Sequence, residues 1–224
     1  MKRLFLLSIL YVFSTLASAQ NCNFYYLQNG KTAEITIYKK NGDENGRIVY
    51  KTSSVAKTGT TTTAVVSSEM FNKKGKSFSK ATNNIKCENG VLMMDMKMFI
   101  SPEQQEQIKG EAQASDVYLT YPSSMNAGDA LPDGNFNMEV KSESGLKTTT
   151  DVKITERKVE GKESVTAPAG TWDCYKISYH SVIKIGIMGM GIPIKMDVTE
   201  WFAPGFGVVK TESKYGTTVL TKFE

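Results

Sequence analysis

Apolar and polar residues alternate along most of this chain, and a two-residue period is typical of β-strands with one buried face. In residues 32–39, Ala33, Ile35 and Ile37 share one face while polar residues occupy the other. Turn residues such as Asn41-Gly42 follow these segments and reverse the chain. The repetition of strand and turn predicts an all-β protein.

The same pattern continues to the carboxyl end. We expect strands at residues 32–39, 47–56, 60–71, 77–87, 91–99, 135–140, 146–159, 162–166, 172–185, 192–202, 207–213 and 217–223. Short connections favour an antiparallel meander. Because long open strand edges promote aggregation, we expect the meander to close into a barrel or to curl into a half-barrel.

One helix is predicted in the middle of the chain. Ser101 is a suitable N-cap, Pro102 fits the first helical position, and Gln104 completes a capping box, with an end near Gly110. The fold class is therefore all-β with one or two short helices. The irregular stretch 121–134 is too short for an interdomain linker, so residues 20–224 are expected to form a single domain.

The amino terminus has the pattern of a signal peptide. Lys2 and Arg3 precede an apolar run at residues 4–16, and Ala17-Ser18-Ala19 is an A-x-A cleavage site. The run is shorter than the roughly 20 residues that cross a bilayer, and no later segment is long and apolar enough. We expect cleavage near Ala19, a mature chain from Gln20, no transmembrane segment, and a periplasmic or secreted protein.

Charge excludes one class of partner. The 27 Lys and Arg residues are nearly balanced by 23 Asp and Glu residues, and the basic residues are scattered without forming a stripe. Nucleic-acid-binding surfaces need such a concentration of positive charge. We therefore expect no nucleic acid as partner.

Export makes the three cysteines, Cys22, Cys87 and Cys174, candidates for disulfide formation. Because the number is odd, one thiol stays free or pairs between chains. The connectivity stays open, but a Cys22–Cys87 bond is favoured because it would fix the amino-terminal end to a later strand.

Catalytic residues are not evident. His180 is the only histidine, it falls on the polar face of its segment, and no G-x-S-x-G turn accompanies it. Glu200 and Glu212, which flank Trp201, are candidates for a carboxylate pair of the kind that glycosidases use. The sequence alone brings no such pair together, so we expect a non-enzymatic protein.

Methionine is the most unusual feature of the composition. Seven of the ten that follow the signal peptide lie in two short segments: Met93, Met94, Met96 and Met98 in one, and Met188, Met190 and Met196 in the other. In a strand, Met94, Met96 and Met98 would share one face and form a soft apolar stripe. The second segment is apolar, free of charge and rich in glycine.

Three interpretations of these segments stay open. They form a packed core; or they line a flexible cavity for an apolar ligand, with Met94, Met96, Met98, Met188 and Met190 as the binding residues; or they bind a soft metal such as Cu(I). Because no histidine or cysteine cluster accompanies them, we predict no metal site and no cofactor.

Two further motifs point to a family. The first is the run Pro168-Ala169-Gly170-Thr171-Trp172-Asp173-Cys174-Tyr175-Lys176, and the second runs from Trp201 to Glu212 as WFAPGFGVVKTE. Together they resemble a domain-of-unknown-function family of exported proteins from Gram-negative bacteria, sometimes labelled the TapB family. The resemblance spans most of the mature chain. It implies an all-β periplasmic or secreted protein with no assigned enzyme activity, and it supplies no catalytic residues.

The sequence thus favours an exported, non-enzymatic β-barrel that binds an apolar small molecule or an envelope lipid or protein. Two alternatives stay open. One is a structural or interaction module of the envelope without a pocket, and the other is an envelope glycan hydrolase that uses paired carboxylates.

Overall fold

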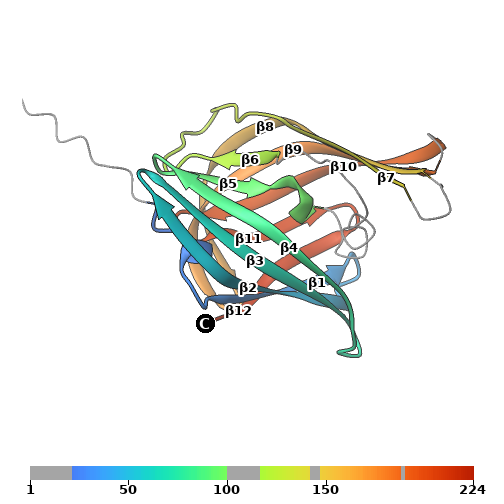
Figure 1. The fold of residues 1–224 in the computed structure, drawn as a ribbon, viewed down its shortest axis with the longest axis horizontal. Coiled ribbons are helices and arrows are strands. Elements are labelled where there is room, and N and C mark those ends of the chain that lie inside the picture. Colours follow the sequence, from blue (N-terminus) through green and yellow to red (C-terminus); the bar gives the residue numbers. More distant parts are fainter. Residues whose placement is uncertain (1–21, 100–116, 142–146, 188–189) are drawn as a thin grey trace, which may run out of the picture.

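The computed structural model describes residues 22–99, 117–141, 147–187 and 190–224, and these ranges are almost entirely β-structure (Figure 1). The expected all-β class is confirmed. Two short 3-10 turns, η1 (Tyr25–Leu27) and η2 (Met96–Phe99), accompany the strands. The strands are β1 (Thr32–Lys39), β2 (Glu44–Thr58), β3 (Thr61–Asn72), β4 (Ser77–Glu88), β5 (Val91–Asp95), β6 (Tyr118–Tyr121), β7 (Gly134–Lys141), β8 (Lys147–Ala167), β9 (Gly170–Ile187), β10 (Met190–Ala203), β11 (Gly207–Ser213) and β12 (Gly216–Phe223).

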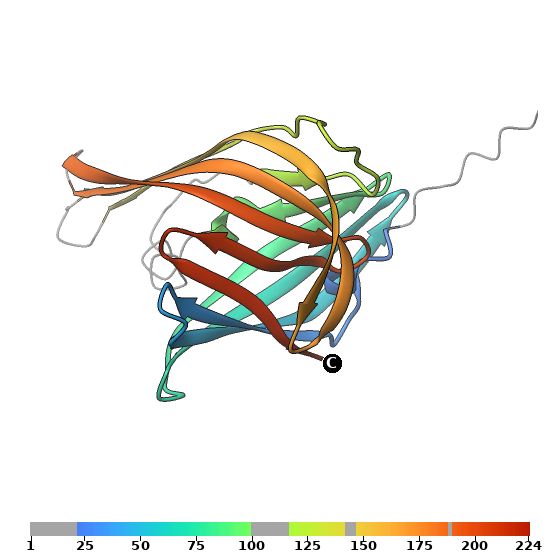
Figure 2. The same cartoon turned by 180° about the vertical axis from the view of Figure 1, so that it is seen from behind.

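All strands belong to one antiparallel sheet with the order β6-β5-β4-β3-β2-β1-β12-β11-β10-β9-β8-β7. Neighbours in the sheet are neighbours in the chain, except that the first strand pairs with the last, with Ala33 opposite Phe223. The sheet curls until its two edges, β6 and β7, approach each other (Figures 1 and 2). The result is a nearly closed barrel. None of the described residues lies in a helix that is long and apolar enough to cross a membrane.

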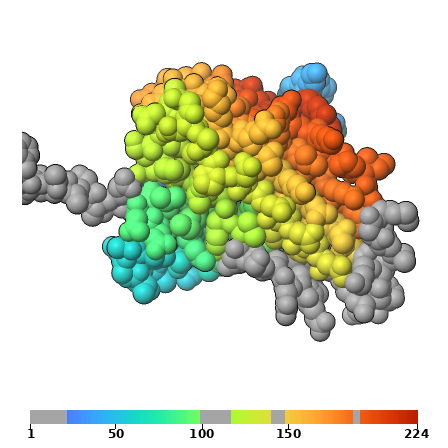
Figure 3. All heavy atoms as spheres, turned by 90° about the horizontal axis from the view of Figure 1, so that it is seen from above, coloured from blue at the N-terminus to red at the C-terminus, as the bar shows by residue number. Residues whose placement is uncertain are grey.

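The seam between β6 and β7 is filled by the connecting residues 122–133, which pair with β8. Leu131 N donates to Arg157 O (2.8 Å), and Val159 N donates to Asp129 O (2.9 Å). In the view from above, residues of this part of the chain cover the surface between β5 and β8 (Figure 3). Gly134 then begins β7 so close to β6 that an added Cβ would lie 2.6 Å from Leu119 Cδ2. Glycine therefore lets the two edges meet.

The amino-terminal residues close one end of the barrel, and we call residues 22–27 the plug. Tyr25 N donates to Gly205 O (2.7 Å), and its ring stacks on Phe206 with 4.7 Å between the centroids. A disulfide joins Cys22 to Cys87 of β4, so the favoured pairing is confirmed. The remaining cysteine, Cys174, is free and buried.

Two strand predictions were wrong in detail. The strand expected at 91–99 ends at Asp95, because the Asp95 carboxylate accepts a hydrogen bond from Lys97 N (3.0 Å) and turns the chain into η2. The two strands expected around Gly161 are one long strand, β8. Register shifts at Thr155/Lys158 and Val159/Gly161 show that β-bulges, not a turn, bend it. The helix predicted from Ser101 lies outside the described residues.

Strands β7 to β10 extend beyond the rest of the barrel at the end opposite the plug, as a projecting ribbon that we call the arm (Figures 1 and 2). In the arm, β10 pairs with β9 from Met190–Ile187 inward to Phe202–Tyr175. Each strand of this pair therefore runs continuously from the arm, through the barrel wall, to the plug. The same two strands also form part of the wall of a cavity inside the barrel.

Candidate functional site: a cavity inside the barrel

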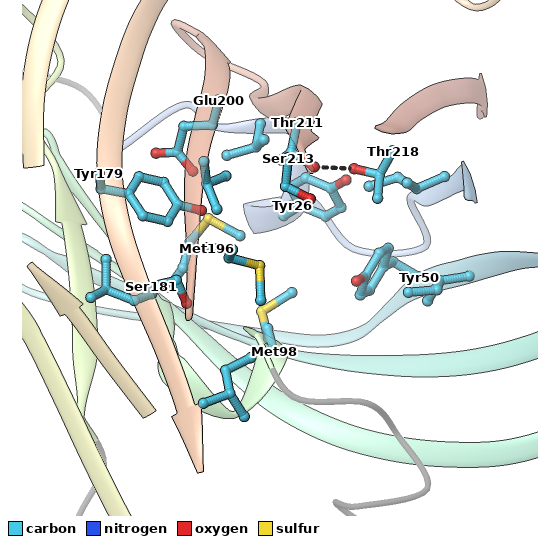
Figure 4. Close-up of a pocket in the computed structure, with 17 residues that line it drawn as sticks. Tyr26, Tyr50, Met98, Tyr179, Ser181, Met196, Glu200, Thr211, Ser213 and Thr218 are labelled. Atoms are coloured by element: carbon cyan, nitrogen blue, oxygen red, sulfur yellow. Dashed lines mark hydrogen bonds between the residues drawn. The ribbon is translucent and has the colours of Figure 1, made fainter. Parts of the chain in front are cut away.

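A cavity of about 270 Å³ lies inside the barrel between the plug and the arm (Figure 4). Its volume is nearly twice the ~150 Å³ of an engineered apolar cavity that binds benzene. The residues that line it are Tyr26, Ile35, Ile48, Tyr50, Met94, Met98, Ile154, Tyr179, Ser181, Ile183, Met196, Val198, Glu200, Val208, Thr211, Ser213 and Thr218. They come from both halves of the meander, so the cavity exists only once the sheet has curled.

Most of the wall is apolar, and strand alternation explains why. In β9 and β10, Met196 lies opposite Ser181 and Val198 lies opposite Tyr179, and directly opposed residues point to the same face of a sheet. This face is the inner one, while Asp197, between the two β10 residues, is exposed. Met98 and Met196 lie at the centre of the view in Figure 4. Unbranched thioether side chains adapt their shape to what they contact.

The cavity wall also carries polar groups. Tyr26 belongs to the plug itself, and Tyr50 lies near it on β2, with the two rings edge to face at 6.2 Å. Thr211 hydrogen-bonds Thr218 (2.7 Å) beside the turn between β11 and β12, away from the plug, and lies opposite Glu200 of β10. The cavity is therefore amphipathic, with two phenols at its closed end.

Glu200 is fully buried at this closed end and is poorly neutralised. Its Oε1 lies 3.9 Å from Nη2 of Arg157, also fully buried, and its Oε2 accepts a hydrogen bond from Tyr121 (3.4 Å). Neither Oε1 nor Arg157 Nη2 has a hydrogen-bond partner. Burial raises the pKa of Glu200 to about 7, while the nearby Arg157 and the hydroxyls of Tyr121 and Tyr179 act in the opposite direction.

Arg157 links this carboxylate to the barrel seam. Its Nη1 donates to Thr120 O on β6 (3.1 Å) and to Pro132 O just before β7 (2.9 Å). Its guanidinium also lies 4.7 Å from the ring centroid of Tyr121, which stacks on Phe202. One buried cation thus connects both sheet edges to β10.

At the other end, the apolar inner face continues out of the barrel along the arm. Ile194 lies opposite Ile183, and Ile192 lies opposite Ile185, on the same face as Met196. Ile192 is 86% exposed, and Ile185 and Ile194 are also exposed. The face that leads from the cavity to the arm is therefore apolar.

The five predicted binding methionines have different positions. Met94 and Met98 line the cavity. Met96 is buried at the seam, where its Sδ lies 2.7 Å from the position of a Cβ added to Gly134. Met188 lies outside the described residues, and Met190 pairs with Ile187 at the end of the arm. Their role in binding stays a prediction.

The residues considered for catalysis lie elsewhere. His180 is on the outer face, about half exposed, and its Nε2 lies 3.3 Å from Glu156 while its Nδ1 contacts Asp197. Glu212 lies opposite Thr199, one position along from the pair that contains Glu200, and so points to the other face. The thiol of Cys174 has a pKa raised to about 11 by burial, which keeps it protonated. These groups do not converge.

The sequence pattern did not predict the polar groups of the cavity wall. A signal for Glu200 was present, because Met196, Val198, Glu200 and Phe202 alternate with Asp197, Thr199 and Trp201 and place one carboxylate on an apolar face. No comparable signal existed for Tyr26 and Tyr50. Their place in the cavity wall depends on the plug and on the closure of the sheet.

Comparison with known proteins places the chain in a family. Residues 28–220 match the family model described as DUF3108-like. The chain belongs to the DUF3108-like family. This agrees with the resemblance to a domain-of-unknown-function family that the Pro168 and Trp201 motifs indicated. No curated protein matches this DUF3108-like chain at a significant level.

Two crystal structures share the fold of this DUF3108-like protein. One is of a candidate lipoprotein from Parabacteroides distasonis, with a TM-score of 0.73 and 22% identity over 92% of this chain and 100% of that one. The other is of a candidate exported protein with a YmcC-like fold from Bacteroides fragilis, with a TM-score of 0.71 and 21% identity over 90% of this chain and 98% of that one. At this identity the likeness establishes the fold.

Proposed function

We propose that this protein is an exported, non-enzymatic binding protein that holds an apolar small molecule or an envelope lipid inside its barrel. The observation that carries the proposal is the cavity of about 270 Å³, whose wall is mostly isoleucine, valine and methionine. Protein interiors are normally close-packed, so a cavity of this size among apolar side chains offers a ligand contacts on every side. A ligand of matching chemistry would make those contacts.

Methionine supports a ligand that varies in shape. Met94, Met98 and Met196 reach the cavity from two distant parts of the chain, and each has three rotatable bonds. These side chains can repack around different apolar groups without moving the strands. This adaptable wall favours a lipid-like ligand over a rigid cofactor.

Export is supported by three independent features. The first is the leader pattern at residues 1–19, and the second is the Cys22–Cys87 disulfide, which is stable in oxidising compartments. The third is that the two fold relatives are described as a candidate lipoprotein and a candidate exported protein. We propose a periplasmic or secreted location for the mature chain.

The hydrolase alternative is less well supported. Glycosidases hold two carboxyl groups about 5–9 Å apart across the scissile bond. Glu200 is the only carboxylate among the described residues that line the cavity, and Glu212 points to the opposite face. The geometry therefore favours binding without turnover.

A cavity-filling substitution tests the proposal. Ser181→Phe on β9 places an aromatic ring in the cavity, and we expect it to weaken the binding of an environment-sensitive apolar dye by more than about tenfold, which corresponds to ~1.4 kcal/mol. Fluorescence titration of the mature protein measures this. The matched control is Ser178→Phe on the same strand, because Ser178 lies on the outer face, where it bonds Glu160.

The control should bind the dye like the wild type, and both variants should give the wild-type circular dichroism spectrum. Native mass spectrometry of protein purified from its own envelope would then show a bound molecule in the wild type and less of it in Ser181→Phe. Failure of the wild-type protein to bind any apolar dye, with repeated recovery of empty protein, would contradict the proposal.

A further inference from the structure

We infer that the ligand is a neutral single-chain amphiphile that enters the barrel head first, and that the hydroxyls of Tyr26 and Tyr50 hold its uncharged polar head. This inference rests on the proposed binding function and specifies its ligand class. It follows from three properties of the cavity: unpartnered phenols, the absence of a lining cation, and the position of the phenols at the plug end, opposite the apolar arm.

The first property is a pair of buried phenols without partners. Tyr26 and Tyr50 are 4% and 8% exposed, and both line the cavity. No described residue hydrogen-bonds either hydroxyl, and neither oxygen is among the fully buried side-chain atoms that lack a partner, so both reach the cavity space. Figure 4 shows both on one side of the cavity, with Tyr179 and Glu200 on the other. A ligand that fills the cavity would bury these hydroxyls, so a ligand group that bonds them is favoured over one that leaves them unpaired.

The second property is the charge of the wall. The described lining residues include no lysine, arginine or histidine, and the carboxylate of Glu200 faces the fully buried Arg157 on β8, Tyr121 on β6 and Tyr179 on β9. An anionic head would meet a carboxylate and no cation. A cationic head would lie near Arg157 and would compete with it for Glu200. Burying a charge without a partner is strongly unfavourable, so an uncharged head fits best.

Burial also keeps the two phenols neutral. It raises the pKa of Tyr50 to about 12 and raises that of Tyr26 further. Each phenol can therefore donate one hydrogen bond and accept others over the whole physiological pH range. These groups suit a hydroxyl or an amide, both of which donate and accept.

The third property sets the orientation. Tyr26 belongs to the plug, whereas Met98, Ile183 and Met196 are half-buried at the mouth. Beyond them, Ile194 and Ile192 continue the apolar face into solvent. A head at the plug end places the chain along the methionines and directs its end toward the arm.

Three probes with the same chain test the inference on the wild-type mature protein: decanol, decanoate and decylammonium at pH 8. Each is titrated against the bound apolar dye. We expect decanol to displace the dye at a concentration more than about tenfold below that of either ion, since the ions must lose hydration without gaining a counterion. Decanol should bind equally between pH 6 and 9, and decanoate should bind better as the pH falls and its carboxyl group is protonated.

Conservative variants assign the head to the phenols. Tyr50→Phe and Tyr26→Phe remove one oxygen each and keep the ring in the cavity wall, and we expect each to weaken decanol binding about fivefold more than it weakens dye binding. Tyr215→Phe, at an exposed position outside the cavity, is the matched control and should change neither.

The possible outcomes separate the two levels of the proposal. If no dye binds the wild-type protein, the proposed function itself fails. If the dye binds but the three probes displace it equally, the inferred head-first orientation is wrong while the binding function stands. The same conclusion follows if neither phenol variant weakens decanol binding. Preference for decanoate or decylammonium would also overturn the inference.

Discussion

Replacing Arg157 with methionine is expected to lower the free energy of unfolding by about 3–5 kcal/mol at pH 8, the usual cost of removing one partner from a buried ion pair. The substitution leaves Glu200 buried without a cation and removes the bonds to Thr120 O and Pro132 O that connect the seam. Urea denaturation of the wild-type and variant proteins measures the difference.

The loss of unfolding free energy in Arg157→Met should increase as the pH rises. Burial already raises the pKa of Glu200 above its unfolded value, so its ionisation costs stability as the pH rises toward and through about 7. Without Arg157 this pKa rises further. The destabilisation by Arg157→Met should therefore be larger at pH 8 than at pH 5, where the carboxyl group is protonated.

Two variants control this experiment. Arg47→Met makes the same change at a partly exposed pair, where Arg47 Nε lies 3.2 Å from Glu34, and it should cost less than about 1 kcal/mol. The double variant Arg157→Met/Glu200→Met removes both charges and should recover much of the lost stability, since paired apolar residues often replace a buried ion pair without penalty. If Arg157→Met and Arg47→Met lower the free energy of unfolding equally, Arg157 is not the buried cation that stabilises Glu200.

Removing the Cys22–Cys87 disulfide is the second change with a large expected effect. The bond spans 65 residues, and a crosslink of this length stabilises a protein by about 4 kcal/mol in the chain-entropy model. The variant Cys22→Ser/Cys87→Ser should lose about this much unfolding free energy. It should also bind the apolar dye less tightly, because Tyr26 in the plug forms part of the cavity wall.

Reduction provides the control for the disulfide. Dithiothreitol should lower the stability and the dye affinity of the wild-type protein toward those of the double variant, and it should leave the double variant unchanged. Cys174 is free in both proteins and does not confuse the comparison. If dithiothreitol changes neither the stability nor the dye affinity of the wild-type protein, the plug is held by packing alone.

Local patterns were sufficient to predict most of the strands. Alternation of the kind seen at Ala33, Ile35 and Ile37 is set by the geometry of one strand, and turn residues such as Asn41-Gly42 mark its end, so neither depends on the rest of the fold. The sequence also favours the pairing of Cys22 with Cys87, because the free amino-terminal end needs an attachment. The structure confirms both.

Long-range features could not be predicted in this way. A β-bulge changes the alternation, so the burial of Arg157 in a strand that reads as mostly polar could not be foreseen. The pairing of Arg157 with Glu200 depends on strands that meet only in the folded sheet. Met96 was expected on one face with Met94 and Met98, but the turn at Asp95 moves it to the seam. Closure of the sheet decides which methionines reach the cavity.

Methyl NMR of methionine-labelled protein tests the central claim most directly. Titration with decanol should shift or broaden the methyl resonances of Met94, Met98 and Met196, which line the cavity, and should leave that of Met125 unchanged, because Met125 is buried outside the lining. Assignment follows from single Met→Leu variants. If decanol leaves the three lining methionines unchanged, or shifts all methionine signals alike, the barrel interior is not the binding site.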